Sequence, residues 1–200
     1  MKIYYSPASP FVRKVMIVAR EVGLAERIEL LPSKAGPVER DATIRAENPL
    51  GQVPTFTTDD GQVLYDSRVV CEYLDDLGRG GLFGTGAERW RNLTDAALAD
   101  GLMGAALLAR YETLLRPQEF RWEGWVDGQL EKVGDALDRI EGAAAGFGER
   151  FDIGTIGFAC GLGYLDFRFP DLGWRQGRPQ AASWFEAVSE RPSVKATVPA

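Results

Sequence analysis

The stretch Asn48–Ser67, NPLGQVPTFTTDDGQVLYDS, constrains the fold of this chain more than any other segment. It opens with a Pro at the second and a Gly at the fourth position of a turn, the arrangement that a type I turn favours. Asp60-Gly61 separates two short apolar runs, so we expect two antiparallel strands joined by a two-residue loop. Asp66-Ser67 ends the second strand and provides the cap of a helix that continues to Leu77.

The proline at position 54 predicts a break in the sheet edge. A proline has no N–H to donate to a ladder, so its place at the start of a strand needs an explanation, and we expect the bend at Pro54 to expose a backbone edge at Val53. We expect this edge to lie close to the helix that begins at Ser67. A sheet edge beside the positive end of a helix is a receptor for a short peptide that carries a carboxylate.

The residues before this stretch predict a β-α-β unit. Lys2–Tyr5 is a short strand, and Ser9 and Pro10 suit the cap and first turn of an apolar helix that follows it. Arg27–Leu31 is a second strand, which should pair with the first in parallel. Together with the hairpin and the helix after it, these segments make a four-stranded mixed α/β unit.

A glycine-rich segment divides the chain. Residues 78–86 contain five glycines, and no strand pattern follows them. Helical patterns recur after this linker in three segments: 87–115, 126–140 and 181–189. Residues 153–165 are apolar all round, so we expect a buried central helix there. The sequence therefore predicts two domains, residues 1–77 and 87–200, joined by the linker 78–86.

Composition excludes several classes of function. The net charge is −6 and neither half of the chain is basic, which disfavours nucleic-acid binding. The longest uncharged apolar run, 153–165, is too short to span a membrane, and Met1–Val22 lacks the apolar core of a signal peptide. We therefore expect a cytoplasmic protein.

The absence of histidine limits the chemistry further. With no His in 200 residues, Ser-His triads, His-ligated metals and imidazole acid–base catalysis are excluded. Cys71 and Cys160 lie in apolar helical segments and form no C-x-x-C motif. We expect both to be buried free thiols, and we expect no metal site.

The order of the motifs resembles the cytosolic glutathione S-transferase family over essentially the whole chain. SPFVRKV follows the first strand, and NPLGQVP and YDSRVVCEYL come next. ALADGLMGA and GFACGLGYLDFR are similar to helices of a bacterial serine-type branch. The resemblance implies the glutathione S-transferase fold, with a thioredoxin-like N-terminal domain that binds glutathione and an all-α C-terminal domain. It also implies a homodimer that conjugates the glutathione thiolate to small hydrophobic electrophiles in detoxification.

The resemblance carries roles to individual residues of the N-terminal domain. Ser9 matches the serine that activates the thiol, Val53 matches the residue whose backbone pairs with the cysteinyl unit, and Pro54 matches the family's cis-proline. Asp66 and Ser67 match the acidic–serine pair that holds the γ-glutamyl end of glutathione.

The resemblance also suggests the remaining contacts of the two substrates. Gln52 stands where some relatives have a lysine, which weakens attraction to the glycyl carboxylate. Phe11 is a further glutathione-binding candidate and, with the helical stripe after the linker, a wall of the electrophile pocket. That stripe has a spacing of four residues, at Met103, Leu107 and Tyr111. The same spacing is common in core helices, so both interpretations stand.

A serine suffices for the implied chemistry. A free thiol has a pKa of ~8.5, and lowering it by about two units needs ~2.7 kcal/mol of preference for the thiolate. One hydroxyl donor and one helix N-terminus can supply this amount, so no general base is required. The first-helix motif contains no cysteine, which makes dithiol exchange a poor fit.

Simpler interpretations remain beside these. Ser9 is also a good helix cap, and Ser6 is a competing activator. Arg13 and Lys14 have the pattern of solvated helix charges. Asp152 and Thr155 occupy a capping box in an order that predicts a weaker reciprocal bond. The same scaffold would also suit a glutathione-binding regulatory protein with little turnover, or a glutathione-dependent reductase or isomerase.

Overall fold

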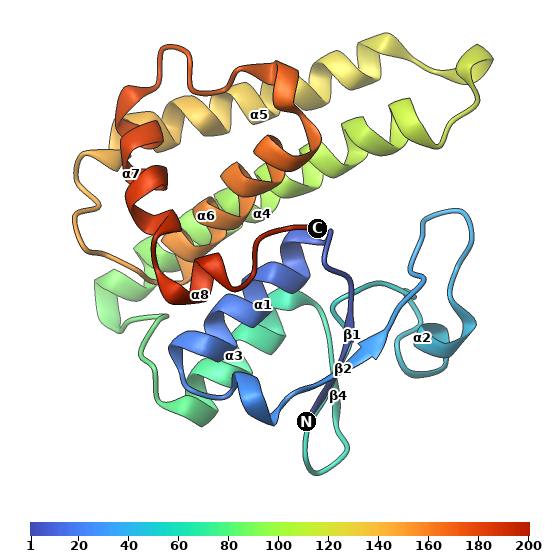
Figure 1. Cartoon of the computed structure of the whole chain (residues 1–200), viewed down its shortest axis with the longest axis vertical. Helices are drawn as coiled ribbons and strands as arrows, with labels where there is room; N and C mark the ends of the chain where they lie inside the picture. The colour runs from blue at the N-terminus through green and yellow to red at the C-terminus, as the bar shows by residue number, and fades with distance from the viewer.

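The computed structural model describes all 200 residues, and its strands form one sheet near the N-terminus (Figure 1). The strands are β1 Lys2–Tyr5, β2 Glu29–Pro32, β3 Phe56–Thr57 and β4 Val63–Leu64. Their order in the sheet is β2-β1-β3-β4, with β1 parallel to β2 and antiparallel to β3, and β3 antiparallel to β4. The predicted four-stranded mixed sheet is confirmed.

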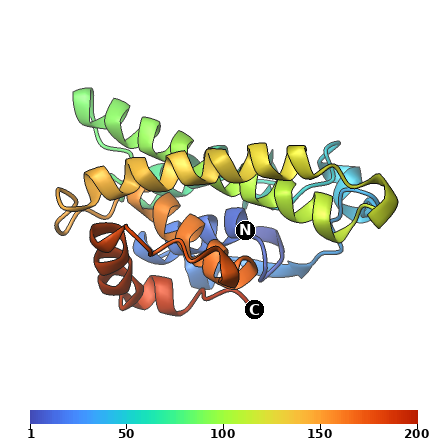
Figure 2. The ribbon, with the colours of Figure 1, turned by 90° about the horizontal axis from the view of Figure 1, so that it is seen from above.

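Helices α1 Pro10–Glu21 and α3 Ser67–Gly78 lie between this sheet and the helical domain (Figure 1). A short helix, α2 Ala42–Glu47, stands at the side of the sheet. The helical domain comprises α4 Gly86–Leu114, α5 Glu123–Ala144, α6 Ile153–Arg168, α7 Pro179–Ser189 and α8 Pro192–Lys195. Short 3-10 turns occur at Ala25–Arg27, Gln118–Phe120 and Pro170–Leu172. Figure 2 shows α4 and α5 running side by side along the molecule.

The hairpin forms, but the two-residue loop predicted for it is wrong. Thr58 N donates to Gln62 O at 2.9 Å, so the pairing continues one residue beyond β3. Gly61 N donates to Thr58 O at 3.1 Å, and Gly61 has a φ of 88°. The loop therefore has three residues, Asp59, Asp60 and Gly61, and its last residue needs the left-handed backbone that glycine adopts freely.

Helix α6 is the buried central helix that its composition predicts. Every residue from Ile153 to Leu165 is buried. Its glycines let α4 come close: a Cβ at Gly157 would stand 2.7 Å from the Cβ of Ala99. Because α4 and α6 pack at this short distance, side chains from both helices can contribute to one continuous surface.

A capping box fixes the start of α6. Asp152 Oδ1 accepts hydrogen bonds from the backbone N–H groups of Gly154 and Thr155, and Asp152 N donates to Thr155 Oγ1 at 2.9 Å. Both bonds of the capping box are therefore present, and the weaker reciprocal bond that the sequence predicts stays a prediction. The reversed order works because a threonine hydroxyl at the third helical position reaches back to the cap N–H.

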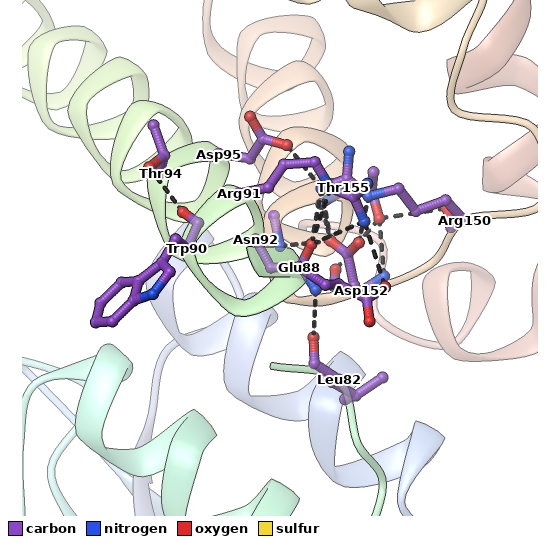
Figure 3. Close-up of polar contacts among 11 residues, drawn as sticks. Leu82, Glu88, Trp90, Arg91, Asn92, Thr94, Asp95, Arg150, Asp152 and Thr155 are labelled. Carbon is purple, nitrogen blue, oxygen red and sulfur yellow. Dashed lines mark hydrogen bonds and ion pairs between the residues drawn. The ribbon is translucent and has the colours of Figure 1, made fainter. Parts of the chain in front are cut away.

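The same end of α6 is joined to α4 and to the linker by a polar cluster (Figure 3). Arg150 forms ion pairs with Asp152 and, at 2.6 Å, with Asp95 on α4. It also donates to Asn92 Oδ1 at 3.3 Å, and Asn92 Nδ2 donates to Leu82 O in the linker at 3.4 Å. These contacts hold the linker and the first part of α4 against the N-terminus of α6.

Arg13 and Lys14 are buried, so their assignment as solvated charges is wrong. Helices α6 and α8 pack on the outer side of α1 and bury the turn that carries Arg13 and Lys14. Lys14 is 1% exposed and its Nζ lies 2.5 Å from Asp100 Oδ1 on α4. Asp100 Oδ2 also accepts from Arg68 Nε at 2.8 Å, which brings α3 into the same network.

The C-terminal segment returns to the first helix. Arg13 Nη2 donates to Val194 O at 3.3 Å, and Arg191 Nη2 lies 2.9 Å from Glu21 Oε2. Ser193 Oγ donates to the other oxygen of Glu21. Helix α8 and the residue before it are therefore bonded to the first turn and to the last residue of α1.

We expect Asp100→Ala to lower the free energy of unfolding by about 3 kcal/mol, because it leaves the Lys14 ammonium buried without a partner. Arg68→Gln is the matched control: the Arg68 side chain is 65% exposed, so its loss should cost less than about 1 kcal/mol. Urea unfolding followed by circular dichroism measures both. Equal losses in the two variants would contradict the importance of the buried pair.

Candidate functional site

A cavity of about 530 Å³ lies between the two domains. Its walls are the start of α1, the loop segment before α2, the turn before β3, and one side of α4 and α6. The predicted site residues that line it are Ser9, Phe11, Gln52, Val53, Leu107 and Tyr111. Residues distant in the sequence, from both predicted domains, therefore meet around one space.

Four predicted site residues do not line this cavity. Met103 was expected on the electrophile wall, but it is fully buried in the core. It faces Gly161 of α6, where a Cβ would stand 3.7 Å from Met103 Cγ, so the helix contact closes over it. Pro54 is buried behind Val53, while Asp66 and Ser67 lie beyond β4 at the start of α3.

Ser9 is both a helix cap and a free donor. Its backbone is extended, Pro10 follows as the first helical residue, and its Oγ accepts a hydrogen bond from Val12 N at 3.3 Å. That bond uses an oxygen lone pair and leaves the hydroxyl proton without an acceptor in the protein. The cavity-lining hydroxyl can therefore donate to a ligand without giving up the cap.

Ser6 stays in competition with Ser9. It lines the same cavity, and its carbonyl oxygen accepts from Ser9 N at 3.1 Å. The local turn that this bond closes holds both hydroxyls near the entrance to α1.

The turn before β3 presents the backbone of Val53. Gly51 N donates to Asn48 O at 2.8 Å, and the buried Asn48 side chain donates to Thr55 Oγ1 at 2.8 Å. Thr55 Oγ1 in turn donates to Gln52 O at 2.7 Å. The Val53–Pro54 peptide is cis, as the resemblance implies, and neither the N–H nor the C=O of Val53 has a partner in the protein. An unpaired peptide edge is therefore available.

The first turn of α3 also has free donors. Asp66 caps the helix by accepting from Arg68 N at 2.9 Å. The backbone N–H groups of Ser67 and Val69 make no hydrogen bond within the protein. Orphan N–H groups at the positive end of a helix favour an anion, and the exposed Asp66 carboxylate beside them favours a cation.

Several polar residues line the cavity that the sequence does not predict as site residues. They are Arg40, Arg110, Tyr164 and Arg168. Arg40 lies against the Gly51 turn and donates to Pro49 O at 2.6 Å. The spacing of four between Tyr164 and Arg168 places them on one face of a helix. That face could be identified from the sequence, but its meeting with Arg110 of α4 depends on how the helices cross.

Burial shapes the ionisation of these groups. It raises the pKa of Tyr164 to about 12 and also raises the pKa of Tyr111, and the charge of Arg110 opposes both shifts. Burial, with the neighbouring charge of Arg110, lowers the pKa of Arg168 from its ordinary value. The two tyrosines therefore remain protonated hydrogen-bond donors at neutral pH.

The two cysteines are far less reactive than free thiols. Both are buried and unpaired, as predicted. Burial raises the pKa of Cys71 to about 12 and that of Cys160 to about 11, so neither ionises to a thiolate near neutral pH. No group of three or more His, Cys, Asp or Glu side chains is placed to hold a metal ion. None of the helices combines the length and apolarity needed to cross a membrane.

Comparison with known proteins identifies relatives that bind glutathione. The family described as glutathione S-transferase, N-terminal domain, matches residues 8–77, and the corresponding C-terminal domain matches 123–187. An uncharacterised glutathione S-transferase-like protein of Escherichia coli K12 is 35% identical over 100% of this chain and 98% of its own.

Two crystal structures of a glutathione transferase family member from Pseudomonas fluorescens Pf-5 also match. One, with bound glutathione, is 50% identical with a TM-score of 0.97, covering 100% of this chain and 98% of that chain. The other, with bound S-(propanoic acid)-glutathione, is 49% identical with a TM-score of 0.92, and the match covers 100% of both chains.

We expect Tyr164→Phe to leave the tyrosinate absorbance of the folded protein almost unchanged at about pH 11. With a pKa of about 12, only about a tenth of the Tyr164 hydroxyl is ionised there. In urea the same substitution should remove the full signal of one tyrosine, which serves as the control. If the folded wild type and the folded variant differed by the absorbance of one full tyrosinate at about pH 11, the pKa of Tyr164 would not be raised by burial.

Proposed function

Because this chain belongs to the glutathione S-transferase family, we propose that it is an enzyme that conjugates the thiolate of glutathione to small hydrophobic electrophiles. The observation that carries the proposal is the cavity in which the free Ser9 hydroxyl and the unpaired Val53 backbone meet. A relative at 50% identity was crystallised with glutathione, and another structure holds a thioether of glutathione, which supports both the substrate and the type of product.

The tripeptide would lie along the exposed sheet edge. In this proposal the Val53 N–H and C=O pair with the cysteinyl unit as an added strand does, and the buried Pro54 supports them from behind. The α-carboxylate of the γ-glutamyl end binds the free N–H groups at the start of α3, including that of Ser67, and Asp66 faces its ammonium group.

The glycyl end would lie at the other side of Val53. Gln52 is exposed there and lines the cavity, and Arg40 stands beside the same turn. A guanidinium near this carboxylate compensates for the lysine that some relatives have at position 52. Phe11 covers the cavity next to the cysteinyl position and contributes apolar contact.

The reaction then needs only a stabilised thiolate. Ser9 donates its free hydroxyl proton to the sulfur, and the N-terminus of α1 adds a favourable field, so the thiol proton leaves to water near neutral pH. The sulfur lone pair forms the S–C bond while the leaving group departs with its electron pair. Leu107 and Tyr111 face the electrophile across the cavity.

We expect Ser9→Ala to raise the pKa of the bound thiol by roughly one unit and to reduce turnover at neutral pH by about tenfold. The rate falls as pH falls through this pKa, so the midpoint of the pH–rate profile should move upward. Ser6→Ala is the matched control and should leave the profile in place. A shift in the Ser6 variant alone would assign the role to Ser6, and an unchanged profile in both would reject a serine activator.

Calorimetric titration with glutathione, followed by ultraviolet detection of the thiolate, separates catalysis from binding. We expect binding together with a thiolate signal at neutral pH. Binding without that signal would favour a glutathione-binding regulatory protein on the same scaffold.

We also propose that the protein is a homodimer, as the resemblance implies. Large apolar side chains are exposed on α3 and α4: Val69 is 47% and Trp90 is 69% exposed. Sedimentation equilibrium should give about twice the chain mass of 22.0 kDa. A value equal to the chain mass at micromolar concentration would contradict the dimer.

A further inference from the structure

Two arginines on the helical wall of the cavity have no carboxylate partner. Arg110 comes from α4 and Arg168 from the end of α6, and both are half-buried. Neither guanidinium forms an ion pair or donates a hydrogen bond within the protein, although both line a cavity that faces the proposed thiol. Arginine is the side chain best shaped to bind a carboxylate through two parallel hydrogen bonds.

The acidic neighbours of these arginines are engaged elsewhere. Asp166 pairs with Arg175 at 2.5 Å and also accepts from the Trp174 indole at 2.7 Å. Glu112 pairs with Arg116 at 2.8 Å. The chain therefore offers acidic groups close by in sequence, yet folds them away from the cavity.

The two guanidinium groups line the same cavity, and no carboxylate neutralises either of them. Arg168 lies with its Cζ 3.7 Å from the centroid of the Phe167 ring, which orients the group but leaves its charge intact. Burial and, after it, the charge of Arg110 lower the pKa of Arg168, as expected for two like charges with restricted access to water. An anion between them would relieve that repulsion.

Neighbouring side chains complete an amphipathic pocket. The Tyr111 and Tyr164 hydroxyls belong to the same wall and donate to no group in the protein. Leu107 and Leu114 supply apolar surface on α4. A ligand that fits has a short apolar portion and one anionic head.

Glutathione does not require these arginines. In the proposed function its γ-glutamyl carboxylate binds at the start of α3 and its glycyl carboxylate binds beside Gln52 and Arg40, both on the sheet side. Arg110 and Arg168 are on the opposite, helical side. We infer that they bind a carboxylate of the second substrate, so that the electrophiles of this enzyme are short organic acids. This inference rests on the proposed function.

For an organic acid with a halide on its reactive carbon, the chemistry balances without a further reactant. The sulfur lone pair forms the S–C bond as the C–halide bond breaks, and the halide leaves with the bonding pair. The carboxylate keeps its charge throughout and remains bound by the arginines. The product is a carboxyalkyl thioether of glutathione.

Product binding tests the inference independently of turnover. Calorimetry would compare S-(2-carboxyethyl)glutathione with S-propylglutathione, which has nearly the same length and no charge on the added chain. We expect the wild-type protein to bind the carboxyethyl thioether about tenfold more tightly. Arg110→Gln and Arg168→Gln should each remove most of that preference, and the double variant should abolish it. Arg139→Gln, at an exposed position on α5, is the matched control and should keep it.

Binding of glutathione itself reports on the rest of the site. We expect it to be unchanged in all these variants, which also shows that they are folded. Equal affinity of the wild type for the two thioethers, or a preference that survives in the double variant, would overturn the inference and leave the proposed function intact. A parallel loss of glutathione affinity would assign the arginines to glutathione and also overturn it. Failure of the wild type to bind glutathione would reject the proposed function itself.

Discussion

The buried ion pair between Lys14 and Asp100 restricts how the two sides of the cavity can face each other. Lys14 is on the helix that begins at Ser9, and Asp100 is on the helix that carries Leu107, Arg110 and Tyr111. A charge buried without its partner is strongly unfavourable, so only a narrow range of docking geometries keeps both groups satisfied. Apolar packing between α1 and α6 stabilises the contact between the domains, whereas this ion pair restricts their relative orientation.

Different interactions position the two walls of the cavity. On the sheet side, a local turn, the buried Asn48 and short side-chain-to-backbone bonds fix the Val53 segment, largely within a few residues of sequence. On the helical side, position comes from close packing of α4 on α6, which glycines such as Gly157 permit. A wall made by local hydrogen bonds suits the invariant part of a substrate, and a wall made by helix faces can vary its side chains without altering the fold.

This difference also explains what could be predicted from the sequence. The order of elements, the mixed sheet, the Ser9 cap and the open Val53 edge follow from local turn and cap chemistry, so they could be predicted from the sequence. Met103 has the spacing of a wall residue, but its burial is decided by where α6 crosses. Lys14 belongs to a residue type that is usually exposed, and it is buried for the same reason. The presence of Arg110 and Arg168 in one cavity wall depends on how two helices cross, which no local pattern of sequence predicts.

The return of the C-terminal segment to the first helix couples the site to the order of synthesis. Val194, Ser193 and Arg191 bond to α1, whose first turn carries Ser9. During translation the strands and α1 emerge first, while the residues that complete the packing around α1 follow about 170 residues later. The turn that carries Ser9 therefore reaches its final environment only after the helical domain has been synthesised, and the cavity stays incomplete until then.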